Sequence, residues 1–151
     1  MEQNLNNASF AEVLLVEDNR DDVILTQQAF KQSHIAIHLN NVKNGVDCMN
    51  FLRKEGDYKD VPTPNLILLD LNMPIMDGRE VLEAISKDES LSHLPVVILT
   101  TSEDERDVYK MYQLRCSSYI VKPIDFTQFL RVVNELSEYW FTVVALPPLQ
   151  H

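Results

Sequence analysis

The chain has few of the residues that characterise exported, metal-chelating or membrane-spanning proteins. Its two cysteines, Cys48 and Cys116, show neither CxxC spacing nor the density of a disulfide framework. The four histidines lack a ligand spacing such as HxxxH. No apolar run approaches the roughly 18 residues of a membrane span, and no basic region precedes an apolar core at the N-terminus. These absences predict a protein of the reducing cytoplasm.

Basic residues are also scarce. The chain has 13 Lys and Arg against 23 Asp and Glu, which gives a formal net charge of −10. This charge has the wrong sign for binding a phosphate backbone or an anionic bilayer. We therefore expect neither nucleic acid nor a membrane among the partners.

The length of 151 residues, with 45% hydrophobic residues and only three glycines, fits one compact domain with a full core. Residues 1–10 are polar and rich in asparagine, which predicts a disordered N-terminal arm. We expect the domain to cover residues 11–138 and an apolar C-terminal extension to cover residues 139–151.

Short apolar runs alternate with segments of helical periodicity along the domain. Strands are expected near residues 13–16, 35–39, 66–69, 96–99 and 119–121, and helices near residues 20–33, 46–54, 77–87, 102–114 and 125–136. Crossovers of helical length join parallel strands and place helices on both faces of the sheet. The pattern predicts an α/β fold, a doubly wound five-stranded parallel sheet of flavodoxin-like order 2-1-3-4-5.

Polar residues follow the carboxyl ends of four of these strands. Glu17 and Asp18 follow the first strand, and Asp70 follows the third. Thr100 and Lys122 follow the fourth and the fifth. Open α/β sheets bind ligands at this edge, and strands 1 and 3 are neighbours in the predicted order. We therefore expect the three carboxylates to meet in one pocket.

Asp70 has an alternative interpretation as the N-cap of the next helix. Asp77, with Glu80 three residues later, forms the better capping pair. Met73-Pro74 also keeps the intervening chain extended or turning. We therefore interpret Asp70 as a functional carboxylate.

Three clustered carboxylates need a compensating charge, because two of them about 4 Å apart repel by about 4 kcal/mol at an effective dielectric constant near 20. All-oxygen ligation suits Mg²⁺ or Mn²⁺, and Mg²⁺ commonly joins carboxylates to a phosphate oxygen. In such a phosphoryl-transfer site, the Thr100 hydroxyl can donate to a phosphoryl oxygen, and Lys122 can reach another oxygen or pair with Asp70. Asp70 is then the nucleophile, and its product is an aspartyl phosphate.

Each of these residues also has a simpler interpretation. A lone Lys122 is usually solvated, a lone Thr100 is usually an ordinary strand residue, and Asp18 can cap a helix. Their joint position at one sheet edge has no packing rationale. Tyr119, on the fifth strand, is more often a core aromatic than a switch.

Taken together, these residues resemble the receiver domain of two-component response regulators, the CheY-like family, over about residues 12–138. The motifs that carry the resemblance are Glu17-Asp18, Asp70-Leu71-Asn72-Met73-Pro74 with Asp77-Gly78, Leu99-Thr100-Thr101 and Tyr119-Ile120-Val121-Lys122-Pro123. Two features depart from the usual pattern, the long loop at 56–64 and Arg115-Cys116 in place of a Gly-Ala pair.

The resemblance implies that Asp70 accepts a phosphoryl group from a sensor histidine kinase. It also implies a Mg²⁺ ion ligated by Asp18, Asp70 and the Asn72 carbonyl, with Glu17 acting mainly through a coordinated water. The chain would then be a phospho-acceptor, with at most self-catalysed phosphorylation and dephosphorylation, and not an enzyme.

The resemblance further implies a switch, in which Thr100 moves onto the phosphoryl group and Tyr119 rotates with it. The loop at 56–64 and the tail at 139–148 look like the phytochrome-associated response regulators of cyanobacteria, so a phytochrome kinase is the specific candidate donor. The chain ends soon after the last expected helix, as expected of a stand-alone receiver without an output domain.

Two other functions match parts of this pattern. A haloacid-dehalogenase-type phosphatase also uses a nucleophilic Asp, a Thr, a Lys and Mg²⁺, but the sequence after Asp70 offers no second carboxylate as the acid or base. A flavin-binding module is disfavoured because the acidic loop at 17–22 would repel a cofactor phosphate.

The tail contains Trp140, Phe141, Val143, Val144 and Leu146 and continues the apolar stripe of the last expected helix. Contiguous apolar patches mark interaction surfaces. We predict a symmetric homodimer through this helix and the tail, with folding back of the tail onto its own domain as the alternative.

Overall fold

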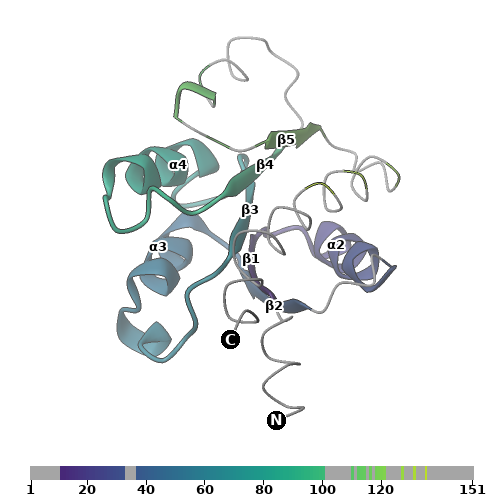
Figure 1. Ribbon diagram of the computed structural model, residues 1–151, viewed down its shortest axis with the longest axis horizontal. Helices are drawn as coiled ribbons and strands as arrows, with labels where there is room; N and C mark the ends of the chain where they lie inside the picture. Colours follow the sequence, from purple (N-terminus) through teal and green to yellow (C-terminus); the bar gives the residue numbers. More distant parts are fainter. Residues whose placement is uncertain are drawn as a thin grey trace, which may run out of the picture.

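The computed structural model contains one five-stranded parallel sheet in the order β2-β1-β3-β4-β5 (Figure 1). The strands are β1 (Ala11–Val16), β2 (Ile37–Val42), β3 (Leu66–Asp70), β4 (Val96–Thr100) and β5 (Ser118–Val121). This order confirms the predicted doubly wound sheet and places β1 beside β3. The register pairs Val16 with Leu69, so the two strands end together at their carboxyl ends.

The structure describes residues 11–32, 37–100, 110, 112–114, 116, 118–121, 127, 131 and 135. The helices within these residues are α2 (Arg20–Gln32), α3 (Gly45–Arg53), the 3₁₀ turn η1 (Gly56–Tyr58) and α4 (Gly78–Lys87). The helices expected near 102–114 and 125–136 fall mostly outside the described residues, as do the arm at 1–10 and the tail at 139–151. None of the described helices has the length and apolar character needed to cross a bilayer.

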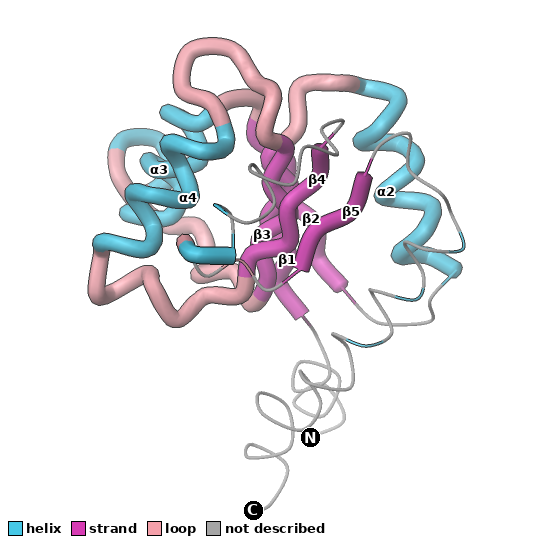
Figure 2. Tube along the Cα trace, turned by 90° about the horizontal axis from the view of Figure 1, so that it is seen from above, coloured by secondary structure: helices cyan, strands magenta, loops and turns pink. Residues whose placement is uncertain are grey.

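Helices cover both faces of the sheet. Figure 2 shows α3 and α4 on one side of the strands and α2 on the other. Alternate residues of β1 point to opposite faces of the sheet. Leu14 and Val16 belong to the core cluster under α3 and α4, whereas Val13 and Leu15 belong to the cluster on the opposite face. The fold therefore has two cores that share one sheet.

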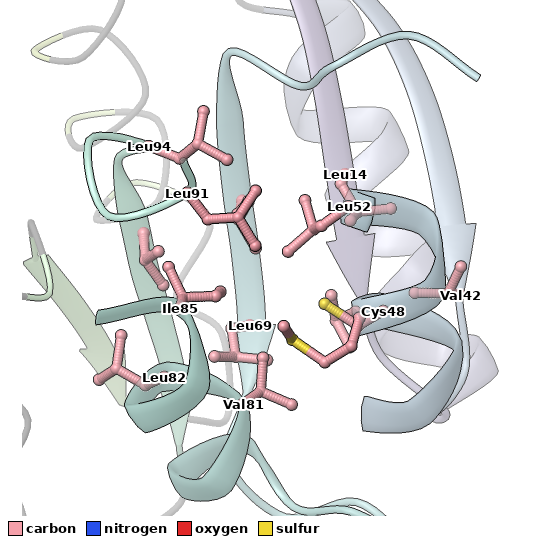
Figure 3. Packing of buried hydrophobic residues seen from close by; sticks show 14 of the residues in the cluster. Leu14, Val42, Cys48, Leu52, Leu69, Val81, Leu82, Ile85, Leu91 and Leu94 are labelled. Atoms are coloured by element: carbon pink, nitrogen blue, oxygen red, sulfur yellow. The ribbon is translucent and has the colours of Figure 1, made fainter. Parts of the chain in front are cut away.

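The central strand β3 is buried along its whole length. Leu66 and Leu68 face one core and Ile67 and Leu69 face the other, which explains why the sequence shows an unbroken apolar run rather than alternation. Each such side chain contributes roughly 1.5–3 kcal/mol on full burial. Figure 3 shows Leu69 packed among side chains of α3 and α4.

Capping residues fix where the helices begin. The Asp77 carboxylate accepts from the backbone N–H groups of Arg79 and Glu80, and the Glu80 side chain accepts from the Asp77 N–H, which confirms the predicted capping box. Asn19 accepts from the Asp22 N–H at 3.1 Å, as expected for the start of α2. Asn44 is the N-cap of α3, and its side chain accepts from the Asp47 N–H.

The loop at 56–64 is more ordered than its polar sequence predicts. Residues Gly56–Tyr58 form η1, and the ring centroids of Tyr58 and Phe51 lie 5.4 Å apart. Pro64 is buried. The loop thus packs back on α3 through one aromatic pair, which alternation and turn propensity do not reveal.

Gly45 allows two loops to meet. Its N–H donates to the Met76 carbonyl at 3.2 Å, which joins the start of α3 to the turn between β3 and α4. A Cβ atom at this position would collide with the Met76 carbonyl oxygen and lie 2.7 Å from Cγ2 of Val81. Only glycine leaves the space that this approach requires.

We therefore expect Gly45→Ala to lower the free energy of unfolding by roughly 1–3 kcal/mol, because the added methyl group forces backbone atoms apart. Urea denaturation measures the change. Val46→Ala, at the next and exposed position of α3, is the control, and its effect should stay within about 0.5 kcal/mol. Equal effects of the two substitutions would contradict the role assigned to Gly45.

Cys48 lies in the core with none of its surface exposed, and burial raises the pKa of its thiol to about 12. The thiolate is the reactive form of cysteine, so the native thiol should resist Ellman's reagent at about pH 8 and react once the chain unfolds. Since the folded state keeps a proton that the unfolded state releases, stability should fall as the pH rises from about 9 toward 12. Rapid labelling of native Cys48, followed by mass spectrometry, would contradict this prediction.

Candidate metal and phosphoryl-acceptor site

Glu17 and Asp18 form a short acidic turn between β1 and α2. The Glu17 N–H donates to the Val42 carbonyl at 3.0 Å, which extends the β1–β2 ladder by one residue. The Glu17 carboxylate is fully buried and accepts from the Asn19 N–H at 3.2 Å, whereas Asp18 is exposed. One carboxylate of the pair is therefore fixed inside the fold, and the other faces solvent.

Asp70 is the last residue of β3, and only 2% of its surface is exposed. It pairs with Leu99 of β4, and its carboxylate accepts from the Asn72 N–H at 3.1 Å. The sequence predicted an acid at the edge of the central strand, and the structure places it there with its side chain oriented by the following turn.

The three carboxylates predicted to meet do so. Each carboxylate has one oxygen atom that lies within 4.8 Å of an oxygen of the other two, for Glu17, Asp18 and Asp70. Two of these groups are almost completely buried, so solvent does little to screen their repulsion. The donor set consists of oxygen atoms alone, which fits a hard divalent cation such as Mg²⁺ or Mn²⁺ and not a thiolate- or imidazole-bound metal.

The turn after Asp70 is tightly built. The Gly78 N–H donates to the Leu71 carbonyl at 3.0 Å, and a Cβ on Gly78 would lie 2.6 Å from the Leu71 Cα. Within this turn the Met76 N–H donates to the Pro74 carbonyl at 2.8 Å, and Ile75 between them has φ of 72°. This is a γ-turn that a β-branched residue adopts only under strain. The sequence motif includes Pro74 and Gly78, but it gives no indication of the strained backbone at Ile75.

A cavity of about 240 Å³ lies beside the acidic turn. Its lining includes Glu17, Asp18 and Arg20 from the turn and from α2, and Asn41 and Lys43 from the end of β2. Sequence reasoning did not select Asn41 or Lys43. The signal that could have identified Asn41 is that it places a polar side chain on the face of β2 that Ile37 and Leu39 begin.

The other predicted residues are placed only in part. Thr100 ends β4 and pairs with Val121, one residue past the Asp70–Leu99 pair, and its side chain is outside the described part of the structure. Lys122 is also outside it. Tyr119 is half-buried, packs against the core, and meets Tyr112 edge to face at 5.9 Å. Its switching role stays a prediction.

Comparison with known proteins identifies a family that matches most of the chain. The family model for the response regulator receiver domain matches residues 13–134. The response regulator Rcp1 of Synechocystis sp. is 42% identical over 135 residues, which cover 89% of this chain and 92% of Rcp1.

Solved structures agree with this result. The phosphorylated cyanobacterial phytochrome response regulator RcpA is 40% identical, with a TM-score of 0.77 over 87% of this chain and 94% of RcpA. The Mn²⁺-bound form of Rcp1 is also 40% identical, with a TM-score of 0.77 over 89% of this chain and 96% of Rcp1. The family match favours a signalling receiver over the phosphatase alternative. The chain belongs to the response regulator receiver domain family, whose members act in two-component phosphorylation signalling.

Proposed function

We propose that Asp70 is the residue that accepts the phosphoryl group. The supporting observation is its position, a buried carboxylate at the end of the central strand within 4.8 Å of oxygens of Glu17 and Asp18. A carboxylate oxygen of Asp70 attacks the phosphorus of a phosphohistidine on a sensor kinase, the N–P bond breaks, and the imidazole leaves. The signal is the added charge on Asp70.

The same carboxylates are proposed to hold Mg²⁺, with Mn²⁺ as a substitute. Asp18, Asp70 and the Asn72 carbonyl are the proposed ligands, and Glu17 contributes mainly through a water. The cation, when bound, offsets the negative charge that gathers as a phosphate approaches three carboxylates. The exposure of Asp18 leaves the site open on the side from which a phosphate can enter.

The switch residues remain part of the proposal. Thr100 lies at the end of β4, one residue past the partner of Asp70, where its hydroxyl can follow a phosphoryl group. Tyr119 lies on the adjacent β5, so movement of Thr100 would reach it through the sheet edge. Lys122 is proposed to contact a phosphoryl oxygen through its ammonium group. Turnover beyond self-catalysed phosphorylation and dephosphorylation is not expected.

The partner is proposed to be a sensor histidine kinase of the phytochrome type, acting in the cytoplasm. The support is similarity to RcpA, described as a phytochrome response regulator, and to the bacteriophytochrome response regulator RtBRR, which is 37% identical with a TM-score of 0.76. We also propose homodimerisation through the region after residue 125 and the apolar tail, for which the support is the sequence alone.

Asp70→Asn should abolish phosphorylation. Incubated with acetyl phosphate and Mg²⁺, the unsubstituted protein should gain the mass of one phosphoryl group, because Asp70 supplies the only nucleophile proposed. The control is Asp60→Asn, an equal change at an exposed residue in the loop before β3, which should leave labelling intact. Labelling of Asp70→Asn at the rate of the unsubstituted protein would refute the assignment.

Asp18→Asn should weaken Mn²⁺ binding by at least about tenfold, since even substitutions behind the ligands typically cost 10–100-fold. The same change removes one of three repelling charges, so the metal-free protein should become more stable, not less. Titration by electron paramagnetic resonance measures the affinity, and urea denaturation in chelator measures the stability. Asp21→Asn, an exposed acid in the first turn of α2, is the matched control. Equal Mn²⁺ affinity of the two variants would argue against Asp18 as a ligand.

A further inference from the structure

Asn41 interrupts an apolar face of β2. Ile37 and Leu39 point toward the core on the α2 side of the sheet, and Asn41 is the next residue on that face. Asparagine is disfavoured in strands, and Asn41 is exposed near the end of this edge strand. What distinguishes Asn41 is therefore the set of hydrogen bonds that its side chain makes.

The side-chain amide of Asn41 reaches across to β1. Its Nδ2 atom donates to the Leu15 carbonyl at 2.9 Å and lies 3.2 Å from the carbonyls of Glu17 and Val42. The residue as a whole is exposed, but the amide points toward the end of β1 and lines the cavity beside Asp18. The amide is thus shared among three carbonyls, of which Leu15 provides the nearest and Glu17 another.

The consequence is that Glu17 is held through both of its backbone groups. Its N–H donates to the Val42 carbonyl at 3.0 Å, and its carbonyl accepts from Asn41. Strand β2 ends at Val42, because the chain turns there to begin α3. The Asn41 side chain therefore continues the hydrogen bonding between the two strands beyond the last residue of β2.

We propose that Asn41 is a positioning residue for the carboxylate cluster. It fixes the Glu17 peptide, and with it the direction in which the following Asp18 leaves β1, so that both carboxylates face Asp70. This inference rests on the proposed cation site, and it assigns Asn41 no contact with the cation or with phosphate. Without the amide, the turn loses the hydrogen bond from Asn41 to the Glu17 carbonyl, and the repulsion among the acids acts against fewer restraints.

A purely structural role would have a different consequence. If Asn41 served only to end the edge strand, its removal would change the stability of the domain but not the affinity of the folded protein for a cation. Neighbouring Asn40 provides a matched control. It lies on the same strand, carries the same side chain and points to the opposite face of the sheet.

The experiment compares Asn41→Leu with Asn40→Leu in the full-length chain. Leucine has nearly the shape of asparagine but cannot donate a hydrogen bond. NMR hydrogen exchange on the metal-free protein measures how fast the backbone N–H of Glu17 exchanges with solvent. This exchange should be on the order of tenfold faster in Asn41→Leu than in Asn40→Leu. In the Mn²⁺ titration, Asn41→Leu should bind on the order of tenfold more weakly, whereas Asn40→Leu should match the unsubstituted protein.

Asn41→Ser provides a second variant should the leucine variant misfold, because its shorter side chain stays polar but cannot reach β1. The proposal is overturned if the Asn41 variants keep both the exchange rate and the Mn²⁺ affinity of the unsubstituted protein while Asp18→Asn loses affinity. That outcome leaves the proposed cation site standing. If the unsubstituted protein binds no Mn²⁺, the cation site and the role of Asn41 both fail.

Discussion

Repulsion among three carboxylates is the constraint around which this end of the molecule is built. Oxygens of Glu17, Asp18 and Asp70 lie within 4.8 Å of one another, and two of the three groups are buried. Groups of like charge this close repel one another, so the backbone that carries them has to be held in place. The fold meets this requirement by placing the acids at the ends of the adjacent parallel strands β1 and β3, whose leucine-rich centres are locked between two cores.

The placement of the acids at neighbouring strand ends also suits the proposed cation site and phosphoryl acceptor. Asp70 is buried, so the charge added by the proposed phosphorylation would act first on residues at the neighbouring strand ends. Strands β4 and β5 lie on that side, and the cavity beside Asp18 lies on the other, toward β2. The site is thus closed toward the core and open toward solvent at Asp18, which suits the proposed transfer of a phosphoryl group from a partner.

The sequence predicted most of this arrangement because its signals are local and strong. The apolar run before Asp70 implied a buried central strand, the Asp77 and Glu80 pair implied the start of α4, and alternation with helices implied the strand order. It could not predict individual contacts that no motif marks. Three such contacts depend on three-dimensional packing, which leaves no periodic pattern in the sequence. They are the hydrogen bonds of Asn41 to β1, the approach of Gly45 to Met76 and the ring contact of Tyr58 with Phe51.

The hydrogen bond from Gly45 to Met76 has an implication for protein engineering. It ties the turn after β2 to the turn after β3, although the two are about thirty positions apart in the chain. Exchanging either turn with that of a relative would disturb the contact between them, because the Met76 carbonyl approaches Gly45, which has no side chain. Chimeras of this domain should therefore transplant the two turns as a single unit, and libraries that vary one should keep the other matched to it.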